Sequence, residues 1–231
     1  MNAYIIVEGR KTEYIVYPKW LEILAPALTR VDNVIDITEN SYYIFCGGGI
    51  PSIYRHIANA VADINAFNSR SEHHIDCLMV CIDTEEESRE YIMSQINRQL
   101  KENNVAPESF DIVVFEQRVS MESWFLGNRK IVGSNPSGEV LSRYLAHYNV
   151  RTDDPELMEI IDDNKDFQTK AQFHHSYLKE VFKEHRIKYS KSNPGEVCKP
   201  YYLNQIIERY KDTGHIPTFG RWYDFVITLQ P

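Results

Sequence analysis

Apolar and polar residues alternate along the first 116 residues in blocks that predict strands and helices in turn. Four short apolar runs, each followed by charged residues or glycines, predict strands, and the nearly continuous third run is typical of a strand buried on both faces of a sheet. These strands are predicted at residues 4–7, 42–46, 75–82 and 111–115. Because a helix-length stretch separates each strand from the next, the pattern indicates βαβ crossovers and a mainly parallel, four-stranded sheet flanked by helices.

The stretches between the predicted strands carry apolar residues at helical spacing. After the first strand these residues are Tyr14, Tyr17, Leu21 and Leu24. A second helix is predicted to begin near Pro51, since proline suits the first turn of a helix. A third helix is predicted over residues 86–102. The fold class expected for this part of the chain is therefore α/β, of the Rossmann-like kind.

The pattern changes in the second half of the chain. Residues 127–138 are rich in Gly, Asn, Ser and Pro, which indicates a connection. Helices are predicted beyond it, at residues 139–148, 154–163, 168–186 and 200–211. We expect an α/β domain over residues 1–127 and a mostly helical region over residues 128–231. That region is either a separate subdomain or an elaboration packed on the sheet.

The composition is that of a soluble globular protein, with 43% hydrophobic and 25% charged residues. No apolar run approaches the roughly 20 residues that cross a bilayer, and the start of the chain lacks the features of a signal peptide. Of the four cysteines only Cys77 and Cys81 are close together, so neither a disulfide framework nor a zinc ribbon is indicated. We therefore expect a cytoplasmic protein with no membrane association.

Charge is distributed unevenly along the chain. Residues 1–164 contain 14 Lys and Arg against 26 Asp and Glu, whereas residues 165–231 contain 11 against 7. An acidic body argues against general binding to a phosphate backbone, which needs a basic surface. The same body would also arise from a carboxylate-rich metal site, with the basic tail holding a polyanion. Alternatively, the difference is an ordinary fluctuation on a solvated surface.

Acidic residues follow the ends of the predicted strands. Glu8 and Gly9 follow the first strand, Asp83 and Glu85 follow the third, and Glu122 lies shortly after the fourth. In an open parallel sheet, ligands gather at the carboxyl ends of the strands. Carboxylates that converge there repel one another, and a hard divalent cation relieves the repulsion by accepting oxygen ligands. The expected occupant is Mg²⁺ or Mn²⁺.

Each of these residues also has a plainer interpretation. Glu8 and Gly9 can form a simple turn. Asp83 and Glu85 can complement the dipole at the start of a helix, and Glu122 can cap another helix.

Three segments, taken in order, resemble the Toprim domain. Residues 6–13 (IVEGRKTE) are similar to its opening strand-and-turn motif, in the form found in RloB-like and OLD-type nucleases. Residues 80–85 (VCIDTE) fall where that family has an apolar strand ending in Asp-x-Asp, and Glu85 stands here in place of the second aspartate. Residues 120–126 (SMESWFL) are similar to a later segment of RloB-like proteins. The resemblance covers roughly residues 3–127.

The resemblance implies metal-dependent hydrolysis of phosphodiester bonds in DNA or RNA. It implies that Glu8 is a metal ligand or general base, and that Asp83 and Glu85 bind the metal. Glu13 and Glu122 would serve a second metal or order its waters. Lys11 would place a positive charge near the scissile phosphate, with Lys199 as an alternative.

The relatives named above also imply a cellular role. RloB-like and OLD-type proteins act in bacterial defence against phage, often beside an ATPase partner. Two other functions stay open: a housekeeping RNA-processing Toprim nuclease, and a catalytically silent Mg²⁺-binding regulatory subunit. An oligomer is also compatible with the sequence.

The basic tail interleaves cations with aromatic residues, a pattern that suits single-stranded or looped nucleic acid. The residues expected to bind it are Lys188, Lys191, Lys199, Tyr201, Arg209 and Arg221. Alternatively, these aromatic positions form the core of a small helical subdomain.

Overall fold

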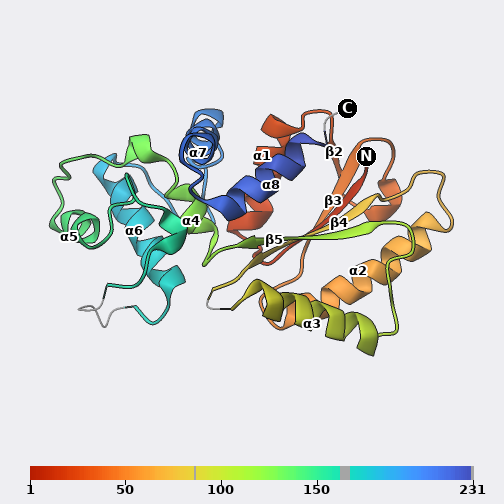
Figure 1. Ribbon diagram of the computed structural model, residues 1–231. Coiled ribbons are helices and arrows are strands. Elements are labelled where there is room, and N and C mark those ends of the chain that lie inside the picture. Colours follow the sequence, from red (N-terminus) through yellow and green to blue (C-terminus); the bar gives the residue numbers. More distant parts are fainter. Residues whose placement is uncertain (86, 162–166, 230–231) are drawn as a thin grey trace. The chain divides into compact units, whose positions relative to one another are not determined.

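The strands form one parallel sheet with β1 at its centre. The computed structural model describes residues 1–85, 87–161 and 167–229, and within them the chain is an α/β protein (Figure 1). The sheet has five strands in the order β2-β3-β1-β4-β5. They are β1 (Ala3–Val7), β2 (Thr29–Val31), β3 (Ser41–Cys46), β4 (Cys77–Asp83) and β5 (Asp111–Gln117).

Helices make up most of the remaining ordered chain. They are α1 (Thr12–Leu24), α2 (Ser52–Asn68), α3 (Arg89–Glu102), α4 (Met121–Phe125), α5 (Glu139–His147), α6 (Lys170–Glu184), α7 (Pro200–Thr213) and α8 (Pro217–Ile227). Short 3-10 helices occur at Val34–Asp36, Arg129–Ile131 and Pro155–Leu157. Within the ranges that the structure describes, no helix combines the length and the apolar character needed to span a membrane.

All four predicted strands are confirmed. The predicted number of strands in the sheet is wrong, because β2 is a fifth strand. β2 pairs with β3 through Thr29, Arg30 and Val31. Its residues are exposed or half-buried, so no apolar run marks them in the sequence. Edge strands are commonly this short, because only one side of the strand has a partner.

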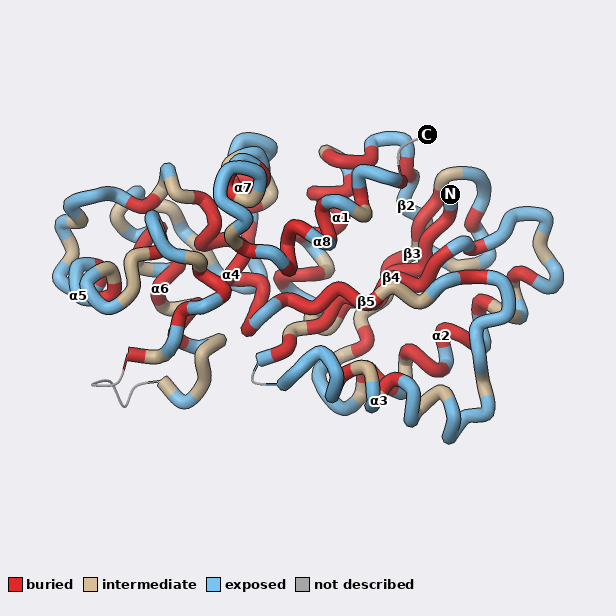
Figure 2. The backbone as a smooth tube through the Cα atoms, in the orientation of Figure 1, coloured by how far each residue is buried: buried red, intermediate tan, exposed pale blue. Residues whose placement is uncertain are grey.

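The register makes β1 and β3 end at the same level, and β4 continues two residues further. Val7, the last residue of β1, pairs with Cys46 of β3 on one side and with Cys81 of β4 on the other. Every residue of β1 is buried, and Figure 2 shows that β4, beside it, is buried along most of its length. The first polar residue after β1, Glu8, therefore stands at the carboxyl edge of the sheet.

Helices cover both faces of this sheet. α2 and α3 lie on one face and α1 on the other (Figure 1). Alternate strand residues such as Tyr4, Ile6 and Val80 form a core with the apolar stripe of α2. Side chains on one face of a strand recur every two residues, and those on one face of a helix recur every 3.6 residues. The core forms where these two apolar surfaces pack together.

Two predicted helices have different limits in the structure. The helix predicted over 86–102 begins at Arg89, because the Ser88 side chain accepts a hydrogen bond from the main-chain N–H of Tyr91 and caps it; residue 86 lies outside the described residues. The prediction of a helix over 154–163 is wrong in its described part. Only Pro155–Leu157 is helical there, as a 3-10 turn, and residues 162 and 163 are not described.

The chain divides into two compact units. We call the first the sheet unit; it comprises Met1–Ile82, Glu87–Glu116 and residues 224–229. We call the second the helical unit; it comprises residues 83–85 and Gln117–Tyr223. The predicted boundary after residue 127 differs from this division. The helical unit begins at Gln117, the last residue of β5, and the end of α8 from Asp224 is assigned to the sheet unit.

Asn68 closes α2 against the beginning of β4. The side chain is 8% exposed. Its Oδ1 accepts a hydrogen bond from the main-chain N–H of Ile75 (2.8 Å), and its Nδ2 donates to the carbonyl of the same residue (3.0 Å). One amide side chain thus pairs both main-chain groups of Ile75, as a neighbouring strand would.

We expect Asn68→Ala to lower the free energy of unfolding by about 2 kcal/mol, because two buried main-chain groups lose their partners. Urea denaturation followed by circular dichroism measures the change. The matched control is Asn97→Ala, an exposed asparagine of α3, which should change stability by less than about 0.5 kcal/mol. Equal effects of the two substitutions would contradict the role of Asn68.

Candidate functional site

The turn after β1 brings two carboxylates to the same edge of the sheet. Glu8 follows β1 directly, and Glu13 lies in the first turn of α1. The Glu13 side chain folds back over Gly9: a Cβ atom on Gly9 would lie 2.8 Å from Glu13 Oε1 and closer still to Oε2. A side chain at position 9 would therefore have to displace the Glu13 carboxylate. Glu13 is 8% exposed and Glu8 is half-buried.

The carboxyl end of β3 adjoins Glu8. The main-chain N–H of Gly47 donates to the carbonyl of Val7 (2.9 Å), and Cys46 Sγ donates to the carbonyl of Glu8 (3.2 Å). A Cβ atom on Gly49 would lie 3.7 Å from Glu8 Oε1. The side chain of Glu8 therefore points toward the glycine turn that precedes α2.

The cysteines of β4 are core residues, as predicted. Burial raises the pKa of Cys81 to about 12, against a hydrogen bond with Tyr17 that lowers it, and the charge of Glu13 raises it further. Burial raises the pKa of Cys77 to about 12 as well. Both thiols therefore stay protonated at neutral pH.

Tyr54 places a buried hydroxyl in the same part of the sheet unit. The residue is 3% exposed, and its Oη has no hydrogen-bond partner in the described ranges. Burial raises the pKa of Tyr54 to about 12, and the charges of Tyr91, Glu8 and Glu87 raise it further. No sequence signal distinguished this tyrosine from the other apolar positions of α2.

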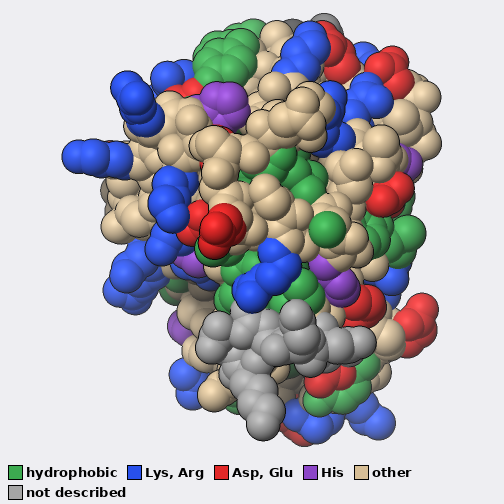
Figure 3. All heavy atoms as spheres, turned by 90° about the vertical axis from the view of Figure 1, so that its left-hand side faces the viewer, with side chains coloured by type: hydrophobic (Ala, Val, Ile, Leu, Met, Phe, Trp, Pro, Cys, Tyr) green, Lys and Arg blue, Asp and Glu red, His purple; other side chains and the backbone are tan. Residues whose placement is uncertain are grey.

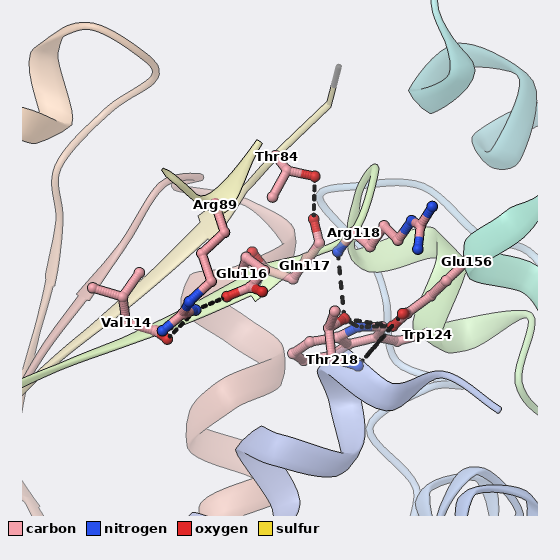
Figure 4. Close-up of polar contacts among 9 residues, drawn as sticks. All are labelled: Thr84, Arg89, Val114, Glu116, Gln117, Arg118, Trp124, Glu156 and Thr218. Atoms are coloured by element: carbon pink, nitrogen blue, oxygen red, sulfur yellow. Dashed lines mark hydrogen bonds and ion pairs between the residues drawn. The ribbon is translucent and has the colours of Figure 1, made fainter. Parts of the chain in front are cut away.

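In the helical unit, hydrogen bonds hold Thr84 against Gln117, the last residue of β5, and against Val119. The main-chain N–H of Thr84 donates to the carbonyl of Gln117 (3.0 Å), and the N–H of Val119 donates to Thr84 Oγ1 (3.1 Å). Figure 4 shows Thr84 beside Gln117. Val119 has φ +71°, a value that a β-branched residue rarely adopts. Glu85 also has a positive φ, of +48°. Asp83 is half-buried and Glu85 exposed.

Glu122 is buried and has charged and polar neighbours. Its Oε1 lies 3.1 Å from His175 Nδ1, 3.3 Å from Tyr189 Oη and 3.9 Å from Lys191 Nζ. Burial acts to raise the pKa of Glu122, but the hydrogen bond from His175 and the charge of Lys191 outweigh it, so the pKa lies below its ordinary value. The ionised carboxylate only accepts, so His175 Nδ1 carries the proton. These neighbours belong to the helical unit itself, and the metal role of Glu122 stays a prediction.

A second buried carboxylate, Glu156, was not identified from the sequence. Its Oε1 accepts hydrogen bonds from Trp124 Nε1 (3.1 Å) and from the hydroxyl of Thr218. The main-chain N–H of Thr218, in the first turn of α8, also donates to it (3.3 Å). Figure 4 shows the Glu156 carboxylate between Trp124 and Thr218. Glu156 therefore caps α8, which is a structural role that no local sequence pattern signals.

In the sheet unit, Arg89 forms an ion pair with Glu116, the acidic residue near the end of β5. Arg89 Nη1 contacts the Glu116 carboxylate and donates to the carbonyl of Val114 (3.2 Å) (Figure 4). This glutamate is 7% exposed, and the arginine supplies the positive charge that its burial requires.

Of the residues predicted to bind nucleic acid, five lie on the surface and one is buried in the core. Lys188, Lys191, Lys199, Tyr201 and Arg221 are exposed. Lys199 is paired with Glu196 (2.7 Å). On the face shown in Figure 3, Lys and Arg side chains are interspersed with acidic ones.

Arg209 is the exception, and its expected place on a binding surface is wrong. It is 0% exposed. Its guanidinium donates to the carbonyls of Val150 (2.6 Å), Asp153 (2.6 Å) and Leu126 (3.3 Å). The side chain holds three separate segments together and is not accessible to a nucleic acid.

The structure thus groups the predicted site residues in two sets. Glu8 and Glu13 stand together in the sheet unit, with the exposed Lys11 between them in the chain. Asp83, Glu85 and Glu122 belong to the helical unit. Over the ranges 1–85, 87–161 and 167–229, no group of three or more His, Cys, Asp or Glu side chains is arranged to hold a metal ion.

No protein-family model, curated protein or solved structure matched the chain in three comparisons. The resemblance to Toprim nucleases therefore rests on the three sequence segments themselves.

The buried position of Arg209 leads to a stability prediction. Arg209→Ala should lower the free energy of unfolding by about 3 kcal/mol, because two buried carbonyl groups and a partly buried one lose their donor. Urea denaturation is again the measurement. Arg221→Ala, which removes an exposed arginine of α8, serves as control and should change stability by less than about 0.5 kcal/mol. If Arg209→Ala were as stable as the control, the guanidinium would not hold these segments together.

A pH-dependent prediction follows from Glu156. Burial raises its pKa from the ordinary 4.5 to about 7, despite hydrogen bonds from Thr218 that lower it. Between these two values the folded state binds more protons than the unfolded state, so this group makes stability fall as pH rises. The slope approaches about 1.4 kcal/mol per pH unit at most.

Glu156→Gln removes that titration while keeping an oxygen acceptor. We expect the free energy of unfolding of the wild type, measured in urea, to fall between pH 5 and pH 8 relative to that of Glu156→Gln. Glu159→Gln, at an exposed glutamate that pairs with Lys170, should give a curve parallel to the wild type. Parallel curves for all three proteins would show that Glu156 titrates normally.

Proposed function

We propose that the chain is a nuclease that hydrolyses phosphodiester bonds in DNA or RNA with the help of Mg²⁺ or Mn²⁺. The observation that carries the proposal is the pair of carboxylates, Glu8 and Glu13, at the carboxyl end of the central strand. Open parallel sheets bind their ligands at this edge. Proteins commonly hold Mg²⁺ through one or two carboxylates, with waters and substrate phosphates completing the shell.

The chemistry of the donors fits such an ion. Glu8 and Glu13 offer hard oxygen ligands, and Gly9 leaves the space beside Glu13 free of any side chain. Asp83 is the last residue of β4 and lies two residues after Cys81, the partner of Val7. We propose Asp83 as a further ligand because the resemblance to the Toprim motif gives the acidic residue at this position that role. Glu85, two residues on, and Glu122 are the other carboxylates proposed for the metal.

The residues of the chain would have distinct tasks. Glu8 would hold the ion or take the proton of the attacking water, and Glu13 would order a water bound beside it. Lys11, exposed at the start of α1, would contact a phosphate oxygen and offset the charge that develops there. A bound divalent cation supplies a water of lowered pKa and neutralises charge on the phosphate.

The cellular role that we propose follows from the resemblance to RloB-like and OLD-type nucleases. It is an effector of defence against phage that works in the cytoplasm with an ATPase partner. The exposed residues Lys188, Lys191, Lys199, Tyr201 and Arg221 would contact the nucleic acid outside the catalytic site. Their support is exposure together with the interleaving of cations and aromatic rings.

The catalytic proposal is tested by Glu8→Gln. Wild-type protein with Mg²⁺ or Mn²⁺ should cleave either DNA or total RNA, and EDTA should abolish the cleavage. Glu8→Gln should lower the rate at least about 100-fold, since a carboxylate in a general-base role contributes that much or more. It should also weaken Mn²⁺ binding, measured by electron paramagnetic resonance.

Two further variants sharpen this test. Glu22→Gln, at an exposed glutamate of α1 that contacts Lys19, should cleave like the wild type. Gly9→Ala should lose cleavage although no carboxylate is removed, because the new methyl group displaces the Glu13 side chain. Full activity of Glu8→Gln in the presence of metal would overturn the assignment.

A further inference from the structure

The outer edge of β3 is open beyond the end of β2. β2 pairs with β3 only as far as Val31 and Tyr43, while β3 continues for three more residues to Cys46. A cavity of about 330 Å³ lies at this step in the sheet edge. Tyr14 of α1 and Asp32, which directly follows β2, also line it.

This cavity adjoins the candidate catalytic turn. Cys46 lines the cavity and donates through Sγ to the carbonyl of Glu8 (3.2 Å). Arg10, another lining residue, follows Glu8 by two positions. A ligand seated in the cavity would therefore lie next to the turn that carries Glu8, within the same compact unit.

The walls combine aromatic rings with two opposite charges. Tyr14 and Phe45 contribute rings. The ring of Tyr14 is held in place by Arg30, whose guanidinium lies 4.9 Å from the ring centroid and donates to Tyr14 Oη (2.7 Å). The side chains of Arg10 and Asp32 make no hydrogen bond or ion pair with any residue that the structure describes. Both charged groups are thus available to a ligand.

We propose that this cavity binds one nucleoside of the strand that is cleaved. A nucleobase would stack on Tyr14 or Phe45, its exocyclic amino group would donate to the Asp32 carboxylate, and the adjoining phosphate would contact Arg10. Single-stranded nucleic acids are recognised in this way, through aromatic stacking and hydrogen bonds to the base edge. The inference rests on the proposed nuclease function and names its substrate class: an unpaired nucleotide.

The size of the cavity supports a single nucleotide. About 330 Å³ is at the lower end of the roughly 300–1,000 Å³ found for small-molecule sites. A stacked base pair cannot present one base to such a cavity, so a duplex would have to open or extrude the base. The cavity therefore selects single-stranded or unpaired segments.

Binding of free mononucleotides tests the cavity apart from catalysis. Isothermal titration calorimetry in EDTA would compare AMP, CMP and GMP with UMP, which lacks an amino group. We expect the first three to bind at least fivefold more tightly than UMP. Asp32→Asn should remove that difference, and Tyr14→Ala should weaken all four at least fivefold.

Control variants separate the cavity from general effects. Asp36→Asn, which alters a nearby acidic residue outside the cavity lining, should bind like the wild type. Tyr14→Phe keeps the ring and should bind within twofold of the wild type. If Tyr14→Ala does not fold, as judged by circular dichroism, Phe45→Leu replaces it and should weaken binding in the same way.

The outcomes distinguish this inference from the nuclease proposal. Mononucleotide binding with the expected preference, without metal-dependent cleavage by the wild type, would support the cavity and overturn the nuclease function. Cleavage by the wild type, with no mononucleotide binding and with unchanged cleavage positions in Asp32→Asn and Tyr14→Ala, would overturn the cavity and leave the nuclease function standing. Equal binding of all four mononucleotides would refute the role given to Asp32.

Discussion

The pairing of β1 with β3 on one side and β4 on the other is the constraint on which the sheet unit depends. All five residues of β1 are buried, so their main-chain groups have no access to water and are satisfied by the neighbouring strands. The register of Val7 with Cys46 and Cys81 makes β1 and β3 end together, while β4 continues to Asp83. Polar side chains are excluded along the strand and first occur at its end, where Glu8 and the glycine turn after β3 meet.

The helical unit depends on a different constraint, the burial of charged groups. Glu122, Glu156 and Arg209 are almost inaccessible to solvent, and a buried charge is costly unless partners surround it. Each of the three receives partners from segments distant in sequence. Arg209, for example, binds carbonyls that lie between 56 and 83 residues away. These contacts hold distant segments together, and they explain why not every basic residue in this part of the chain lies on the surface.

The interpretation of the tail's aromatic residues as a core is confirmed for some of them, and the nucleic-acid-binding interpretation stays a prediction. Tyr202 and Trp222 are fully buried and contribute to the core, whereas Tyr201, close to the first in sequence, is 52% exposed. The aromatic residues therefore divide by helix face, since neighbours along a helix point in different directions. A packed core and an exposed aromatic side chain arise from the same stretch of sequence for this reason.

The sequence by itself determined the four long strands, the parallel crossovers and the place of Glu8. A buried strand requires an apolar run, and that run ends where the chain reaches the polar edge of the sheet. Only the tertiary structure decided β2, α4 and α8, the burial of Arg209 and the capping role of Glu156. β2 is exposed and exists through its pairing with β3 alone. Arg209 and Glu156 have the charge of surface residues. Their burial depends on carbonyl, hydroxyl and indole groups brought together from distant segments, which no local pattern of residues encodes.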